Sequence, residues 1–238
     1  MQTYDDILGV EVFGLSGARV EIDESLPPDM SDAVRARWNE LCACNTRMYD
    51  GPILSVTSVD AEFGVIHAAR DRYARLAVHP SVRTGVRLLS VTAMLVARDA
   101  GGLSHVFFGR RGAQVARYPG MWEIGPSGGL AVPAPNIREI GMSFIANHLR
   151  DEIEEEIGVD ASAFVMRPIA YVRDHNVMSD DIVLRVECAC TIEELAPRID
   201  WEYSETRWVP EDCAASFASE RDVIVTTRAL ARFLSETA

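Results

Sequence analysis

Carboxylates gather in one short segment of the chain, residues 149–160 (LRDEIEEEIGVD), where half of the side chains are acidic. Like charges at helical spacing repel each other, so such a segment needs a physical reason. One interpretation is an acidic face that water solvates. The other is a site where several carboxylates share a divalent cation such as Mg²⁺, which prefers oxygen ligands.

A helix through this segment would divide the acidic side chains between two directions. At about 100° per residue, Glu152, Glu155 and Glu156 fall within about 100° of arc. They border an apolar stripe that indicates the buried face, formed by Met142, Ala146, Leu149, Ile153 and Ile157. The other acids of the segment point toward solvent, and Gly158 is a suitable left-handed C-terminal cap. The sequence therefore places three carboxylates beside the buried edge of one helix.

The surrounding residues resemble the Nudix box. The family pattern ends in Arg-Glu-U-x-Glu-Glu-x-Gly-U, where U is apolar, and residues 151–159 fit it everywhere except at Asp151, the first position. Upstream, RYPGMWEIGPSGGL resembles the family's approach to the box, and downstream ETRWVPEDC resembles its late strand. The usual spacing is exceeded by an insertion within AVPAPNIREIG. Ser143 stands where the family has a glutamate, and Glu139 is a candidate replacement.

This resemblance implies a fold and a domain division. The expected fold is α/β, a Nudix-like α/β/α sandwich with a mixed sheet, over residues 85–238. Residues 1–84 would form an N-terminal α+β extension. The extension, the lengthened approach to the box and the missing box arginine are loosely similar to a Nudix branch of animal UDP-sugar hydrolases.

The resemblance also implies a chemistry. Glu152, Glu155, Glu156 and the backbone carbonyl of Gly129 would bind Mg²⁺ or Mn²⁺, and Glu155 or Glu156 would act as the catalytic base. The expected reaction is hydrolysis of the phosphoanhydride bond in a nucleoside diphosphate linked to another moiety. The best candidate is an NDP-sugar such as UDP-glucose, which would give a nucleoside monophosphate and a sugar phosphate. The alternative is a catalytically weak Nudix-fold domain that binds or senses a nucleotide.

Five further residues are candidates for substrate contacts: Arg110, Arg111, Arg117, Tyr118 and Trp122. The two arginines that end FFGRR could bind phosphate oxygens bidentately, or they could be exposed arginines that aid solubility. Trp122 could stack on a base, although a tryptophan beside proline and glycine more often serves packing.

Composition limits the classes of partner. A net charge of −13 and a pI near 4.8 argue against long nucleic acid or an anionic membrane surface, while a mononucleotide needs only a few local cations. Five unevenly spaced cysteines predict reduced thiols rather than disulfides or a zinc site. The first residues carry no basic region followed by an apolar run. We expect a cytoplasmic protein with a small nucleotide substrate, and a homodimer is a further expectation because the family often dimerises.

The elements that must position these residues follow from periodicity and turn signals. Residues 99–102 (DAGG) predict a hairpin turn. Ser31 is a suitable N-cap for a helix that follows it. Runs rich in β-forming residues predict strands at 10–15, 18–23, 52–62, 86–98, 103–111, 164–174, 181–192 and 205–210. Further helices are expected near 71–77, through the acidic segment and near the C-terminus.

Overall fold

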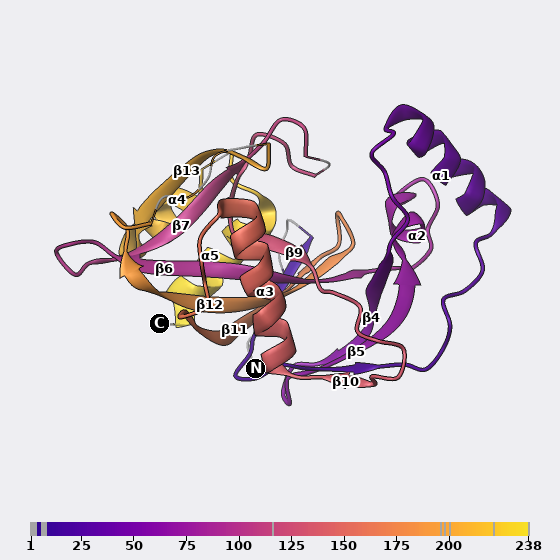
Figure 1. Ribbon diagram of the computed structural model, residues 1–238, viewed down its shortest axis with the longest axis horizontal. Helices are drawn as coiled ribbons and strands as arrows, with labels where there is room; N and C mark the ends of the chain where they lie inside the picture. The colour runs from indigo at the N-terminus through magenta and orange to yellow at the C-terminus, as the bar shows by residue number, and fades with distance from the viewer. Residues whose placement is uncertain are drawn as a thin grey trace.

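One mixed sheet forms the framework of the molecule (Figure 1). The computed structural model describes residues 4–5, 9–115, 117–195, 197, 199, 201–220 and 222–237. The strands are β1 (Tyr4–Asp5), β2 (Val10–Gly14), β3 (Arg19–Ile22), β4 (Pro52–Asp60), β5 (Val65–Arg72), β6 (Leu88–Arg98), β7 (Ser104–Arg111), β8 (Trp122–Ile124), β9 (Ser127–Gly129), β10 (Glu139–Ile140), β11 (Val165–Asp174), β12 (Ser179–Thr191) and β13 (Tyr203–Pro210). The helices are α1 (Asp32–Cys44), α2 (Tyr73–Ala77), α3 (Met142–Ile157), α4 (Ala214–Ala218) and α5 (Val225–Thr237), with a 3₁₀ turn, η1 (Glu211–Cys213).

The sheet contains both parallel and antiparallel pairs. Along its main path the strand order is β1-β2-β11-β12-β6-β4-β5-β3-β10, and β7 branches from β6 to reach β8 and β13. The pairs β12–β6 and β3–β5 are parallel. The predicted hairpin joins β6 to β7, where the Asp99 amide donates to the Leu103 carbonyl at 3.0 Å. Every run predicted as a strand contains one, whereas β5 and the short strands β1, β8, β9 and β10 were not predicted.

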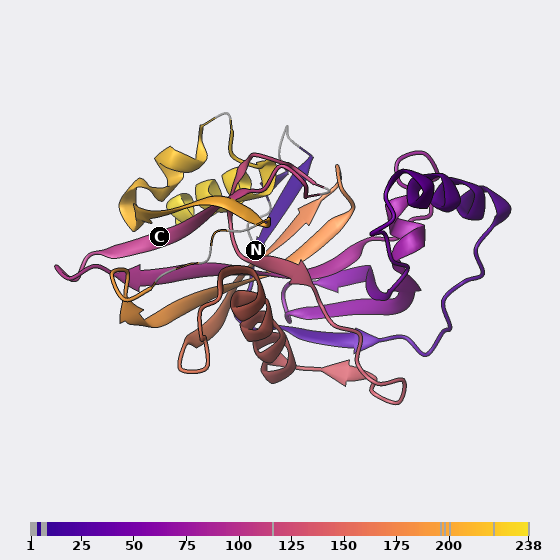
Figure 2. The ribbon, with the colours of Figure 1, turned by 45° about the horizontal axis from the view of Figure 1, so that its top comes forward.

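Helices cover both faces of the central sheet. Figure 2 shows α3 on one side of the strands and the pair α4 and α5 on the other. Each side has its own apolar core. One core includes Leu149 and Ile153 from α3, and the other includes Leu230 and Phe233 from α5. This is the expected α/β/α arrangement around a mixed sheet.

The helix α3 carries the acidic segment. Its apolar stripe faces the core as predicted, because Leu149, Ile153 and Ile157 are buried. Gly158 ends the helix in the left-handed conformation, with φ of 69°. The amide of Gly158 donates to the carbonyl of Glu154 at 3.0 Å, so the predicted cap is confirmed.

The N-terminal residues add strands to the same sheet and a helical pair at one end (Figure 1). Ser31 caps α1 as predicted, since its hydroxyl accepts from the Val34 amide at 3.3 Å. Trp38 of α1 packs against Tyr73 of α2 with ring centroids 6.2 Å apart. The division at residue 84 stays a prediction, and hydrogen-bonded pairs cross it where β2 meets β11 and β4 meets β6.

The insertion before α3 contacts this N-terminal part. Its strand β10 pairs antiparallel with β3, and Glu139 lies opposite Glu21. Arg70 of β5 donates to the carbonyls of Ala134 and Ile137 at 2.9 and 3.0 Å. The Glu139 carboxylate lies 3.5 Å from Arg19, an exposed pair on β3 and β10, so Glu139 belongs to this contact.

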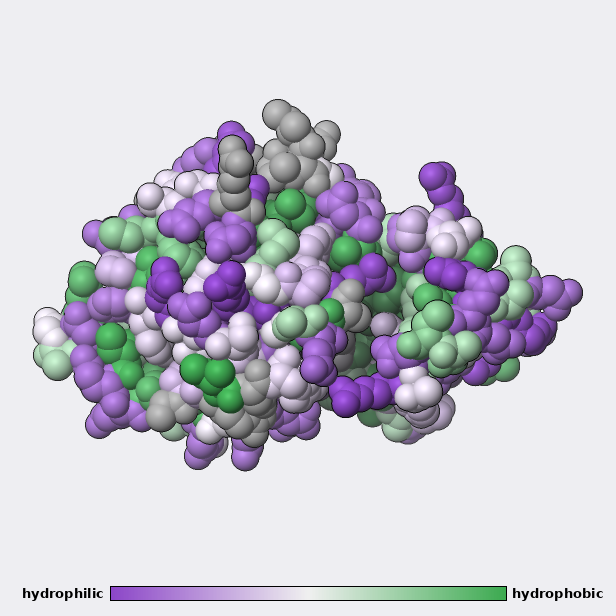
Figure 3. All heavy atoms as spheres, turned by 90° about the horizontal axis from the view of Figure 1, so that it is seen from above, coloured by the Kyte–Doolittle hydropathy of each residue, from purple (hydrophilic) through white to green (hydrophobic). Residues whose placement is uncertain are grey.

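The described surface is mostly hydrophilic. On the face drawn in Figure 3, apolar side chains form small separate groups among polar ones. Four of the most exposed large apolar side chains, Leu26, Phe63, Tyr49 and Trp201, come from different segments. Among the described helices, none has the length and apolar character that crossing a lipid bilayer requires.

Candidate active site

Glu152 lies against strand β9. A side-chain carbon built on Gly128 would collide with the Glu152 carboxylate, so the glycine allows this close approach. The Nε2 atom of His148 lies 3.2 Å from Glu152 Oε1 and 2.9 Å from the carbonyl oxygen of Gly129. Burial raises the pKa of Glu152, and His148 acts in the opposite direction. The same ring nitrogen of His148 therefore contacts two of the predicted metal ligands, the Glu152 carboxylate and the Gly129 carbonyl.

Glu156 stands at the other end of the same helix ridge, also half-buried. Burial raises its pKa to about 9, and the nearby carboxylates of Glu123, Glu202 and Glu152 add to the shift. A hydrogen bond with Tyr203 acts to lower this pKa but does not outweigh burial. A cation bound beside Glu156 would favour its ionised form.

Glu123 is a further candidate site residue, which the sequence did not predict. It is 3% exposed on β8, with Arg111 Nη1 2.6 Å from its Oε1 atom and the Tyr203 hydroxyl donating to the same oxygen at 2.9 Å. Burial and the Glu123 carboxylate both raise the pKa of Tyr203. A signal existed in the sequence: between the apolar Trp122 and Ile124, strand alternation points Glu123 toward the opposite face.

The remaining acids of the segment differ from this pair. Asp151, Glu154 and Glu155 are exposed. Among the described residues, no three His, Cys, Asp or Glu side chains converge as a ready-made metal site. Glu152 and Glu156 are half-buried as predicted, but the predicted place of Glu155 beside the buried edge is wrong, because Glu155 is exposed.

Asp151 occupies the position of the box arginine, and its neighbour Arg150 points elsewhere. Arg150 donates to the Ala161 carbonyl at 3.3 Å and to the Asn147 side chain at 2.9 Å. The guanidinium that interacts electrostatically with Glu156 is Arg111, from strand β7. An arginine from the sheet therefore stands near the carboxylates that the family arginine would brace.

Glu156, Glu123 and Arg111 line a pocket of about 640 Å³, called here the α3 pocket. Its other lining residues are Asn45, Arg47, Gln114, Val115, Ser127, Trp201, Glu202 and Tyr203. Arg111 and Glu123 also line an adjoining pocket of about 240 Å³, called here the Gly129 pocket, to which Arg117, Tyr118 and Gly129 contribute. Four predicted site residues therefore line the Gly129 pocket, and two, Arg111 and Glu156, line the α3 pocket. Arg111 lines both.

Asp181 lines the Gly129 pocket and was not predicted. Its carboxylate accepts from the hydroxyls of Thr92 and Ser179 at 3.1 and 3.0 Å. Burial raises the pKa of Asp181 to about 7, although both hydroxyls act to lower it. Tyr118, in the same pocket, donates its hydroxyl to Asp174 at 2.9 Å.

The last two predicted substrate residues lie apart from both pockets. Arg110 donates to the Gly120 carbonyl at 3.0 Å and lies 3.5 Å from Glu205. Trp122 is 3% exposed and packs against Phe217 with ring centroids 5.6 Å apart. Trp122 therefore takes the packing role that the sequence left open, and Arg110 contacts protein groups.

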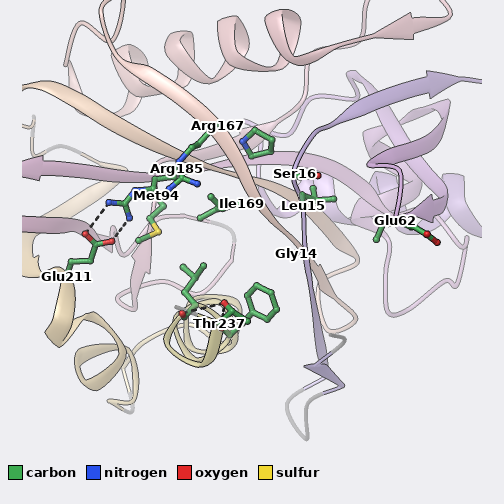
Figure 4. Close-up of a pocket in the computed structure, with 14 residues that line it drawn as sticks. Gly14, Leu15, Ser16, Glu62, Met94, Arg167, Ile169, Arg185, Glu211 and Thr237 are labelled. Carbon is green, nitrogen blue, oxygen red and sulfur yellow. Dashed lines mark hydrogen bonds and ion pairs between the residues drawn. The ribbon is translucent and has the colours of Figure 1, made fainter. Parts of the chain in front are cut away.

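A third hollow, of about 670 Å³, lies beside α5 and holds none of the predicted residues. Figure 4 shows Arg167 and Arg185 there, with Glu211 bound to Arg185. We call it the α5 pocket. It is slightly larger than the α3 pocket, and Arg185 there pairs with Glu187 and Glu211. The raised pKa of Glu156 beside the α3 pocket makes that pocket the better candidate.

Comparisons with known proteins address the fold. Neither a family model nor a curated protein matches the sequence. A crystal structure of DR0079 from Deinococcus radiodurans is 18% identical, with a TM-score of 0.50 over 77% of this chain and 98% of that one. The Nudix hydrolase RenU of M. smegmatis is 21% identical, with a TM-score of 0.46 over 63% of this chain and 85% of that one.

The chain has the Nudix fold.

At these identities the likeness extends to the fold, and activity needs its own argument. Another structure with this fold, the Nudix domain of Shewanella oneidensis NrtR in complex with ADP-ribose, is 14% identical, with a TM-score of 0.42 over 67% of this chain and 93% of that one. The helix α3 carries the residues that resemble the Nudix box, and the half-buried Glu152 and Glu156 are among them.

Proposed function

We propose that this protein is a divalent-cation-dependent hydrolase that cleaves the phosphoanhydride bond of a nucleoside diphosphate linked to another moiety. The observation that carries the proposal is the crowding of Glu156 with Glu123 beside a pocket large enough for a small-molecule ligand. Burial raises the pKa of two half-buried carboxylates on α3, Glu152 and Glu156. That arrangement suits a cation which a phosphate-bearing substrate brings or shares.

The donor set fits Mg²⁺ or Mn²⁺. Mg²⁺ sites in phosphate-processing proteins commonly use one or two carboxylates together with substrate phosphates and water, so a convergent trio of side chains is unnecessary. Glu152, Glu156 and the carbonyl of Gly129 would hold the cation, with Glu155 as a further ligand from its outward position. When bound, such a cation supplies charge neutralisation for the diphosphate and acidifies water.

The protein's own groups have separate tasks in this scheme. Arg111 is held by Glu123 and is placed to orient phosphate oxygens at the junction of the two pockets. Glu156, or else Glu155, accepts the proton of the attacking water once it is ionised. Arg117 and Tyr118 contact the substrate from the Gly129 pocket. Arg110 and Trp122 would not contact the substrate and would only help to position strands β7 and β8.

The substrate we favour is an NDP-sugar such as UDP-glucose, with a nucleoside monophosphate and a sugar phosphate as products. This finer choice rests on the sequence resemblance to UDP-sugar hydrolases, through the N-terminal extension and the lengthened approach to α3. A homodimer and a cytoplasmic location remain expectations from the same resemblance and from composition.

A nucleotide-binding or sensor domain is the second candidate. The features that favour it are Asp151 in place of the box arginine and the outward position of Glu155. Such a domain would bind the same ligands and release them unchanged.

A substrate panel separates the two candidates. Purified protein is incubated with UDP-glucose, ADP-ribose, a dinucleotide and a nucleoside triphosphate, with Mg²⁺, with Mn²⁺ or with EDTA, and products are identified by mass spectrometry. We expect cation-dependent release of a nucleoside monophosphate from at least one diphosphate-linked compound. Binding of these compounds without any product would favour the sensor and contradict the hydrolase.

A further inference from the structure

Trp201 is an exposed tryptophan that lines the α3 pocket. It is 60% exposed, whereas Trp38 and Trp122 are nearly buried, at 9% and 3%. Tryptophan has the largest apolar surface of any side chain, and aromatic side chains commonly line concave ligand sites. The greater part of Trp201 is therefore not used in packing.

The backbone at Trp201 is fixed beside the catalytic candidates. The Gly112 amide donates to the Glu202 carbonyl at 2.7 Å, and a side-chain carbon on Gly112 would collide with the carbonyl of Trp201. Tyr203, two residues on, pairs with Arg111 in the β13–β7 ladder. Trp201 therefore lies at a set position along the same pocket wall as Arg111.

Arg47 approaches the α3 pocket from the N-terminal part of the chain. It follows α1, and its amide donates to the Asn45 side chain at 3.0 Å, which holds the turn after the helix. Within the described residues, the Arg47 guanidinium has no hydrogen bond or ion pair. Arg47 lines the α3 pocket, and a guanidinium without a protein partner can bind a phosphate through two parallel hydrogen bonds.

We propose that Trp201 and Arg47 form the nucleoside-phosphate subsite of the α3 pocket: the nucleobase stacks on the Trp201 indole, and Arg47 binds the phosphate next to the nucleoside. The inference rests on the proposed function and deepens it, because it assigns the nucleotide half of the substrate to one end of the pocket. It also gives the N-terminal part of the chain a direct role in binding. A pocket of about 640 Å³ is in the usual range for a ligand of nucleotide size.

The test is a binding measurement that does not depend on turnover. The probes are the methylene-bridged, non-hydrolysable analogue of UDP and methylenediphosphonate, which lacks the nucleoside, each with Mg²⁺. Calorimetry gives Kd for the wild type and for Trp201→Ala, Trp201→Phe and Arg47→Gln. Phe63→Ala, which removes another highly exposed aromatic ring, and Arg167→Gln, which removes an arginine of the α5 pocket, are the matched controls.

Trp201→Ala should weaken binding of the UDP analogue by about 5- to 100-fold, as expected for loss of one base–aromatic stack. It should leave methylenediphosphonate binding unchanged, and Trp201→Phe should retain most of the affinity. Arg47→Gln should weaken the UDP analogue. The analogue should also quench tryptophan fluorescence in the wild type and not in Trp201→Phe. Both control variants should bind as the wild type does.

The contradicting results are equally distinct. Wild-type affinity of Trp201→Ala for the UDP analogue, or no binding of the analogue by the wild type, would overturn the subsite. If the protein hydrolyses its substrate with Trp201→Ala unaffected in KM, the subsite is wrong and the proposed function stands. If Trp201-dependent binding occurs without any hydrolysis, the subsite stands and the hydrolase is wrong.

Discussion

The α3 pocket and the α5 pocket have similar volumes, about 640 and 670 Å³, but the charged side chains that line them have different surroundings. In the α5 pocket, Arg185 is bound by Glu187 at 2.6 Å and by Glu211, so its charge is met by the protein. In the α3 pocket, burial and neighbouring acids raise the pKa of Glu156 to about 9. A charge paired by its neighbours contributes to the fold, whereas a strongly shifted pKa beside a cavity is a common feature of functional sites.

The largest expected effect on activity comes from removing the Glu156 carboxylate. Glu156→Gln should lower kcat by about 100-fold or more, since it removes a cation ligand and a candidate base together. Glu154→Gln, an exposed acid on the same helix, is the matched control and should keep activity within about twofold of the wild type. Steady-state kinetics on the best compound of the panel measures both. Near-normal turnover of Glu156→Gln would contradict the assignment of the active site to the α3 pocket.

A second prediction concerns the close contact between α3 and β9. Gly128→Ala should displace the Glu152 carboxylate, with about a tenfold loss of activity and a destabilisation of about 1–3 kcal/mol from overpacking. Gly17→Ala is the control, because a side-chain carbon there meets no heavy atom within 4 Å. Thermal unfolding and activity assays check the pair. Equal activity and equal thermal stability of the two variants would show that the position of Glu152 does not depend on its close contact with Gly128.

Asp181 gives a pH-dependent prediction. Its pKa is raised by burial to about 7 from an ordinary 3.8, so the folded protein holds this proton more tightly than the unfolded chain. The stability that results is fully present below pH 3.8 and is lost as the pH rises through about 7. In a chain of this size, each kcal/mol of stability corresponds to about 2–4 °C in Tm. Between pH 4.5 and pH 8.5, the Tm of Asp181→Asn should therefore fall less than the Tm of the wild type. Exposed Asp151→Asn should follow the wild type, and an unchanged slope in Asp181→Asn would contradict the assignment.

The smallest effect is expected in the α5 pocket. Arg167→Gln removes an exposed arginine directly opposite Arg185 in the β11–β12 ladder. Facing like charges destabilise a sheet, so Tm should stay equal or rise slightly, by the equivalent of about 0.2–1 kcal/mol. Activity should stay within about twofold of the wild type. A large loss of activity would mean that the α5 pocket takes part in function and that the contrast between the two pockets is wrong.

Local patterns in the sequence predicted the frame of the site well. The Ser31 cap, the Gly158 cap and the apolar stripe of α3 depend on neighbours in sequence, and the structure confirms all three. The half-buried positions of Glu152 and Glu156 could also be predicted, because spacing on one helix is fixed by the helix itself, and their role as cation ligands stays a prediction.

The partners of those carboxylates could not be predicted in the same way. Glu123, Tyr203 and Arg111 meet because β7 pairs with both β8 and β13, which is a long-range fact of the sheet. His148 lies one helical turn before Glu152, but its contact with the Gly129 carbonyl depends on where β9 lies. Arg47 and Trp201 come together only through the fold, from opposite ends of the chain.

The central claim is that Glu152 and Glu156 bind a divalent cation beside the α3 pocket, and direct Mn²⁺ binding tests it without any substrate. Electron paramagnetic resonance counts free Mn²⁺ during titration of the wild type, of Glu154→Gln and of the double variant Glu152→Gln/Glu156→Gln. The account predicts equal binding by the first two and at least about a tenfold weaker affinity in the double variant, as loss of carboxylate ligands requires. Equal affinity in all three proteins would contradict it.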